Sequence, residues 1–163
     1  LLMFNKTINK NKYGFLLIAL LIITVFFTYT SKVLDKYSLD FSNNSEWVKY
    51  NSDSLLNYIN GGSTVFIDIT ADWCVTCKVN KLLILNSKEF KNIAKNNNLI
   101  LMRGDWTKPD NKITQFLQKS NRYGIPFNAL YNIKYPEGII FSELLTLKEI
   151  KDSIKNMHIS YAE

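Results

Sequence analysis

The chain has 163 residues, of which 20 are basic and 14 acidic, giving a formal net charge of +6 at pH 7. Three of the positive charges, Lys6, Lys10 and Lys12, lie in the first twelve residues, and the others are spread along the chain without forming a basic stripe. Nucleic-acid-binding domains concentrate positive charge on one face or along one helix, so we expect no nucleic-acid partner. The residues after position 45 suffice for one domain with its own hydrophobic core.

The N-terminal segment is predicted to be a transmembrane anchor. Residues 13–31 contain no charged residue and are rich in Leu, Ile, Val and Phe, and a helix of this length spans about 28 Å, close to the hydrocarbon thickness of a bilayer. The basic flank, residues 1–12, lacks acidic residues, so the positive-inside rule places it in the cytoplasm and the rest of the chain on the far side. Residues 32–45 are predicted to be a tether and residues 46–163 a single domain.

A cleaved signal peptide is the alternative interpretation of this segment. The apolar stretch is longer than the usual h-region of about 7–15 residues, and its end, Thr28-Tyr29-Thr30-Ser31, offers no cleavage site of the A-x-A kind. The chain begins with Leu1, so two further interpretations stay open. Either Met3 is the start, or the chain is the final part of a longer membrane protein.

Within residues 46–163 the sequence predicts alternating strands and helices. In chain order we expect a strand at 47–50, a helix at 54–60, a buried strand at 64–70, a helix from the cysteines to about 86, a helix through 90–94, a strand at 99–102, a helix through 113–117, strands at 127–133 and 138–141, and a helix at about 146–157. Helical crossovers demand parallel strands, whereas the short turn at 134–138 demands an antiparallel pair. A mixed sheet with helices on both faces follows.

The two cysteines of the chain, Cys74 and Cys77, are spaced C-x-x-C after an apolar strand and at the start of a helix. Unpaired N–H groups and the helix dipole stabilise a thiolate at the first position, so the pattern predicts a redox-active dithiol. A zinc site would need about two more ligands, and the one histidine is His158 near the C-terminus. Haem attachment would need a histidine where Lys78 stands, and an inert structural disulfide is the remaining alternative.

The sequence resembles the thioredoxin superfamily, and most closely the C-terminal periplasmic domain of DsbD-type thiol:disulfide interchange reductases. The resemblance covers residues 46 to about 157 and rests on Ala71-Asp72-Trp73-Cys74-Val75-Thr76-Cys77-Lys78, Asp68, Asp105-Trp106-Thr107 and Gly124-Ile125-Pro126. It implies an α/β thioredoxin fold, a central mixed β-sheet flanked by helices, here preceded by one transmembrane helix. It also implies that the Cys74–Cys77 disulfide is the redox-active group and that no metal or organic cofactor is needed.

The resemblance also implies roles for individual residues. Cys74 would be the nucleophile that forms mixed disulfides, and Cys77 the resolving thiol. Asp68, which lies mid-strand among apolar residues, would be the buried acid that passes a proton to or from the resolving thiol. Pro126 would be the cis-proline that faces the disulfide, and Ile125 would border the substrate groove.

Further residues are assigned to the surroundings of the cysteines. Trp73, Val75 and Thr76 complete the predicted substrate-binding surface, with Trp73 packing as a lid beside the cysteines. Lys81 departs from several relatives of this family, which carry an acidic residue there. A cation would favour nearby thiolates, but we expect Lys81 to be an ordinary solvated lysine. Trp106 receives no chemical role.

The predicted function is that of a protein-disulfide reductase in the bacterial inner membrane, single-pass, with its thioredoxin-like domain in the periplasm. The Val75-Thr76 pair contains no histidine that would stabilise the thiolate strongly, which favours a reductase over an oxidase. One helix cannot carry electrons across a membrane, so we expect a polytopic membrane electron donor and periplasmic thiol/disulfide proteins as partners. Two alternatives stay open: an apocytochrome c-directed thiol reductase in cytochrome c maturation, and a non-catalytic thioredoxin-like adaptor.

Overall fold

The computed structural model describes residues 10–36 and 46–159, which belong to two separate compact units, Leu1–Asn43 and Asn44–Glu163. The described part of the first unit is one helix, α1 (Lys10–Lys36), which contains the segment predicted to be a membrane anchor. The helical prediction is therefore confirmed. Among the described residues, however, no helix is both long enough and apolar enough to cross a membrane.

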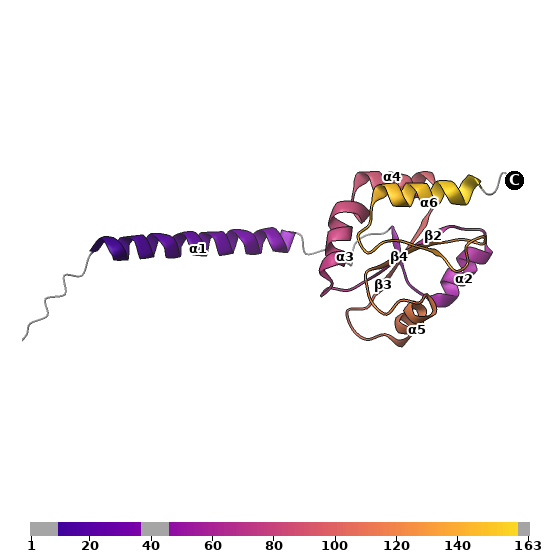
Figure 1. The fold of residues 1–163 in the computed structure, drawn as a ribbon, viewed down its shortest axis with the longest axis horizontal. Coiled ribbons are helices and arrows are strands. Elements are labelled where there is room, and N and C mark those ends of the chain that lie inside the picture. The colour runs from indigo at the N-terminus through magenta and orange to yellow at the C-terminus, as the bar shows by residue number, and fades with distance from the viewer. Residues whose placement is uncertain (1–9, 37–45, 160–163) are drawn as a thin grey trace, which may run out of the picture. The chain divides into compact units, whose positions relative to one another are not determined.

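The second unit contains the predicted alternation of strands and helices (Figure 1). Its elements are β1 (Trp47–Lys49), α2 (Ser52–Asn60), β2 (Val65–Thr70), α3 (Val75–Asn80), the π-helical segment η1 (Lys81–Leu85), α4 (Lys88–Asn96), β3 (Ile100–Asp105), α5 (Asn111–Lys119), β4 (Phe127–Tyr131), β5 (Ile139–Ile140) and α6 (Leu147–Ile159). The strands form one sheet in the order β1-β3-β2-β4-β5. β1, β3 and β2 are parallel, whereas β4 is antiparallel to both β2 and β5, so the predicted mixed sheet is confirmed.

Helices cover both faces of this sheet and enclose two hydrophobic clusters (Figure 1). Leu55 and Ile59 of α2 pack with Ile113 and Leu117 of α5 on one face. On the other face, α4 and α6 pack against the sheet with residues such as Phe90, Ile93, Ile150 and Ile154. Every residue of β2 is buried, because this central strand is covered on both faces, which explains its nearly continuous apolar sequence.

The strand register decides which side chains lie near the cysteines. Successive side chains of a strand point to opposite faces, so Ile67 and Ile69 pack on the α2 and α5 side while Asp68 points to the α4 and α6 side. Asp68 is aligned with Arg103 of β3 and with Asn128 of β4. Asp68, Arg103 and Asn128, which come from three adjacent strands, therefore lie side by side on one face of the sheet.

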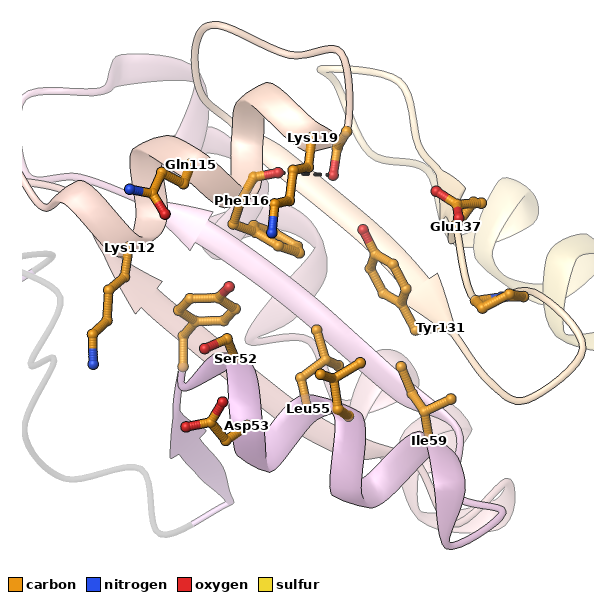
Figure 2. Close-up of a pocket in the computed structure, with 14 residues that line it drawn as sticks. Ser52, Asp53, Leu55, Ile59, Lys112, Gln115, Phe116, Lys119, Tyr131 and Glu137 are labelled. Carbon is orange, nitrogen blue, oxygen red and sulfur yellow. Dashed lines mark hydrogen bonds between the residues drawn. The ribbon is translucent and has the colours of Figure 1, made fainter.

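A groove lies on the opposite face, between α2 and α5. Figure 2 shows Leu55 and Ile59 of α2 on one side of this groove, with Phe116 of α5 and Tyr131 of β4 facing them. Lys119 also borders it. None of the residues predicted to carry the redox chemistry lines this groove, so it is separate from the candidate active site.

Candidate active site

Cys74 and Cys77 form a disulfide, with their Cα atoms 5.3 Å apart. Cys74 is the N-cap of α3, and its Sγ accepts a hydrogen bond of 3.1 Å from the backbone N–H of Cys77. Both residues are buried, Cys74 with 6% and Cys77 with 2% of its surface exposed. A sulfur at a helix N-terminus that accepts a backbone N–H is placed to carry negative charge, which agrees with the nucleophilic role predicted for Cys74.

The segment before β4 lies against this disulfide. Ile125 packs on a small buried cluster formed by Ala71, Cys74 and Cys77. The peptide bond between Ile125 and Pro126 is cis, so the predicted cis-proline is confirmed. The structure therefore places the backbone segment that leads into β4 beside the two sulfurs.

A loop after β3 holds the residues that precede Cys74. The Thr107 hydroxyl oxygen accepts a hydrogen bond of 3.0 Å from the Asp72 N–H, and the Thr107 carbonyl accepts one of 3.3 Å from the Trp73 indole N–H. Asp105 in turn accepts a hydrogen bond of 2.8 Å from the N–H of Thr107. The rings of Trp73 and Trp106 lie 6.4 Å apart. No role was expected for Trp106, and the structure shows that its loop supports the segment that leads into the cysteines.

Exposed apolar side chains surround the disulfide on the solvent side. Trp73 is 60% and Val75 is 74% exposed, and the outer surface of the following helical segment continues this apolar character through Val79, Leu82 and Leu83. Those residues have the helical spacing of a core-facing stripe, yet they point outward. An apolar surface beside a reactive sulfur is suited to contact with another protein.

Asp68 is buried, as predicted, and both of its carboxylate oxygens accept hydrogen bonds. Arg103 Nε donates to Oδ2 at 2.7 Å, and Asn128 Nδ2 donates to Oδ1 at 3.1 Å. The Arg103 guanidinium also lies 3.9 Å above the ring centre of Trp47. Sequence reasoning missed Arg103 and Asn128, because only the pairing of three strands brings them beside Asp68.

Lys81 is the clearest correction to the sequence-based interpretation. It was expected to be solvated, but only 2% of its surface is exposed. The backbone N–H of Lys81 donates to the carbonyl oxygen of Cys77, so the two residues lie one helical turn apart. Side chains at this spacing share one face of a helix, and this face is turned toward the sheet.

The charge of Lys81 is coupled to the acidic and basic groups around it. Burial lowers the pKa of Lys81 to about 8, and the nearby Arg103 guanidinium acts in the same direction. The carboxylates of Asp68, Asp72 and Asp105 oppose this effect and favour the ammonium form. A buried lysine in this setting changes its charge close to physiological pH.

The comparisons with known proteins agree with this geometry. Residues 60–132 match the family model described as thioredoxin-like. The unit that contains these residues has a thioredoxin-like fold. No curated protein matches the sequence closely enough to count as a relative.

Solved structures share the fold of this thioredoxin-like domain. The reduced C-terminal domain of DsbD from Neisseria meningitidis is 15% identical, with a TM-score of 0.52, over 67% of this chain and 98% of that one. The oxidised form of the same domain is 16% identical, with a TM-score of 0.50, over 64% of this chain and 86% of that one. The first thioredoxin domain of mouse protein disulfide-isomerase A4 is 18% identical, with a TM-score of 0.52, over 73% of this chain and 80% of that one.

The redox-active group of the thioredoxin-like domain is the Cys74–Cys77 disulfide itself. Within residues 10–36 and 46–159, no three His, Cys, Asp or Glu side chains are grouped so that they could hold a metal ion. The substrate-binding roles predicted for Trp73, Val75 and Thr76 stay predictions. The structure places these three residues directly around Cys74.

The lowered pKa of Lys81 predicts how stability depends on pH. Between about pH 8 and the ordinary lysine value of 10.5, the unfolded chain holds a proton that the folded protein has released. The free energy of unfolding therefore rises with pH in this window, by up to about 1.4 kcal/mol per pH unit. Lys81→Met removes this contribution, so the stability difference between wild type and variant should change across the window and be flat below it. Urea unfolding at a series of pH values measures this difference, and a flat curve throughout would contradict burial of the charge.

Proposed function

We propose that this protein is a thiol–disulfide oxidoreductase that works as a protein-disulfide reductase. The observation that carries the proposal is the Cys74–Cys77 disulfide at the start of α3, packed against Ile125 and its cis peptide bond within a thioredoxin-like domain. An inert structural disulfide has no need of a first sulfur that caps a helix and accepts a backbone N–H.

The reaction in the reducing direction begins with the Cys74 thiolate. It attacks one sulfur of a partner disulfide, and the partner's other sulfur leaves as a thiolate. Cys77 then loses its proton and attacks Cys74 Sγ, which breaks the mixed disulfide and releases the partner's remaining sulfur. Two electrons pass to the partner, and the Cys74–Cys77 disulfide forms. The partner's two sulfurs take up the proton released by Cys77 and one further proton from solvent.

The direction of electron flow is part of the proposal. The sequence between the cysteines, Val75-Thr76, contains no histidine, and the exposed side chains of Trp73 and Val75 beside Cys74 are apolar. Weak thiolate stabilisation favours a low potential, because strong oxidants of this kind owe their potential to a stabilised reduced form. These features support a reductase.

The partners follow from the proposed direction. A reductase in an exported space must be recharged with electrons from across the membrane, so we propose a polytopic membrane protein as donor. Periplasmic proteins that contain disulfides would be the acceptors, and the exposed side chains of Trp73 and Val75 offer them an apolar contact surface. Apocytochrome c is the alternative acceptor. A non-catalytic adaptor is disfavoured, because such a protein needs no disulfide at this position.

A redox titration tests the proposed direction. The full chain is equilibrated in thiol buffers, and its thiols are trapped by alkylation and counted by mass. We expect a midpoint potential of about −200 mV or lower, toward the thioredoxin value. A midpoint near about −120 mV, at the strongly oxidising end of the scale, would reverse the proposed direction.

Substitutions of the two cysteines test the proposed chemistry. Cys74→Ser should abolish dithiol-dependent reduction of insulin, because it removes the attacking sulfur. Cys77→Ser should instead accumulate a mixed disulfide that non-reducing electrophoresis detects, because the resolving sulfur is missing. If the wild type reduces insulin no faster than the two variants or the dithiol alone, the protein is an adaptor and not an enzyme.

The role predicted for Asp68 has its own test. Asp68→Asn removes the carboxylate, so we expect disulfide exchange to slow by about tenfold or more between pH 6 and pH 9, measured by stopped-flow mixing with a disulfide substrate. The substitution also leaves Arg103 without its ion pair, which costs about 1.5–3 kcal/mol of stability. Arg103→Met is the matched control, because it removes the same ion pair and keeps the carboxylate. Equal rates in these two variants would assign Asp68 a structural role only.

Location in the bacterial inner membrane, with the domain in the periplasm, is also part of the proposal. Its support is the uncharged sequence of residues 13–31 and the basic flank before it. Among the described residues, no helix is both long enough and apolar enough to cross a membrane. Extraction of membranes with alkaline carbonate tests the proposed anchor. Retention of the full chain in the membrane pellet supports the anchor, whereas release into the supernatant removes it from the proposal.

A further inference from the structure

We propose that Lys81 is a positioning residue for the resolving thiol: its buried side chain, on the same helix face as Cys77, stabilises the Cys77 thiolate as it forms. The inference rests on the proposed thiol–disulfide exchange and assigns a role to a residue that was expected from the sequence to be an ordinary solvated lysine.

Lys81 lies one helical turn after Cys77. Its N–H donates to the carbonyl oxygen of Cys77, which fixes the two side chains one turn apart on a shared face, with Cβ atoms about 5–6 Å apart. Both residues are 2% exposed. A long cationic side chain at such a position normally reaches solvent, yet here the helix turns it inward and exposes Leu82 and Leu83 instead.

The neighbouring residue Asn80 holds this part of the helix in place. Lys81 opens the π-helical segment η1, and Asn80 directly before it is also 2% exposed. Asn80 Nδ2 donates to the Glu143 carbonyl at 2.7 Å, and Asn80 Oδ1 accepts from the Leu145 N–H at 3.0 Å. These two hydrogen bonds hold the polar face of the helix toward the interior. π-helical turns of this kind are frequent at functional sites.

The resolving thiol of Cys77 needs a nearby positive charge when it ionises. Cys77 must lose its proton before it can attack Cys74, and a thiolate formed away from water is costly unless a positive group lies near it. Arg103 is already paired with Asp68 at 2.7 Å. Lys81 is the second cation of the cluster, and it interacts electrostatically with the Asp68, Asp72 and Asp105 carboxylates as well as with Arg103.

The resolving step moves one proton and exchanges one disulfide bond for another. The Cys77 proton passes to the Asp68 carboxylate, and the thiolate that remains faces the Lys81 ammonium. Because one anion replaces another, the total charge beside Lys81 is unchanged. The Cys77 thiolate then forms its bond to Cys74 Sγ, the mixed-disulfide bond breaks with its electron pair on the partner's sulfur, and that sulfur takes up the proton held by Asp68.

The ammonium form of Lys81 is required in this step, and the lowered pKa places its loss within reach of ordinary buffers. Loss of the ammonium proton removes the positive charge one helical turn from Cys77. The wild-type rate of resolution should therefore show a second change of slope above about pH 8 that no single thiol titration explains.

The experiment follows the resolving step by itself. The fully reduced full-length protein is mixed with 5,5′-dithiobis(2-nitrobenzoate), whose thiolate absorbs visible light. Attack by Cys74 releases the first thiolate in a phase that depends on reagent concentration. Attack by Cys77 on the mixed disulfide releases the second in a phase that does not. Each phase is recorded from about pH 6 to pH 10.

We expect Lys81→Met to slow the second phase about tenfold at pH 7 and to raise its pH midpoint by about one unit, with the first phase little changed. Lys81→Arg should restore the second phase in large part, because it keeps the positive charge. Lys78→Met is the matched control, because it removes an exposed lysine one residue after Cys77. It should leave both phases unchanged.

Three outcomes would overturn the inference. They are a second phase in Lys81→Met that superimposes on the wild type, an equal slowing in Lys78→Met, and a wild-type profile that fits one titration alone. The last of these needs no variant, so it holds even if Lys81→Met does not fold. A wild-type protein that reacts in neither phase and reduces no insulin would instead refute the proposed function, which keeps the two failures distinct.

Discussion

The ion pair between Asp68 and Arg103 is the interaction on which the rest of the candidate site depends. It joins the central strand β2 to β3 through Arg103 Nε and Asp68 Oδ2, 2.7 Å apart, at the face of the sheet turned toward the cysteine helix. A carboxylate taken out of water needs such partners, and Asn128 of β4 supplies the other one. Once this group is fixed, a second cation can be buried above it. The inward orientation of Lys81 is a consequence, since no apolar surface would tolerate an ammonium there.

The helix that carries the cysteines therefore has an unusual division of faces. Its inner face bears Cys77, Asn80 and Lys81, and its outer face bears Val75 and other apolar side chains. In a helix stabilised by its core contacts alone, the apolar residues would be buried and the lysine exposed. Here the polar inner face lies beside the resolving thiol of Cys77. The apolar outer face lies beside Cys74, the sulfur that a partner must reach. Both departures lie within one turn of the disulfide.

The same arrangement relates the proposed direction of transfer to the proposed role of Lys81. A cation that stabilises a thiolate stabilises the reduced form and so raises the potential, whereas a reductase needs a low one. The carboxylate of Asp68 opposes the cation, so the net field at Cys77 is a balance of the two. Several relatives carry an acidic residue at the position of Lys81, so they lack this opposition of charges. We expect the balance to affect the rate of the resolving step more than the direction of the overall reaction.

Much of this fold and of its redox pair can be predicted from local sequence patterns. The alternating pattern gave the order of strands and helices, because helical and extended periodicities are local, and the C-x-x-C spacing at a strand–helix junction gave the redox pair. A mid-strand aspartate such as Asp68 could be predicted to be buried from its apolar neighbours. The groups that contact that carboxylate depend instead on how the strands pair. Arg103 and Asn128 are 35 and 60 residues away and join it through strand register. The burial of Lys81 depends on a π-helical turn and on long-range hydrogen bonds of Asn80, and no local pattern encodes either.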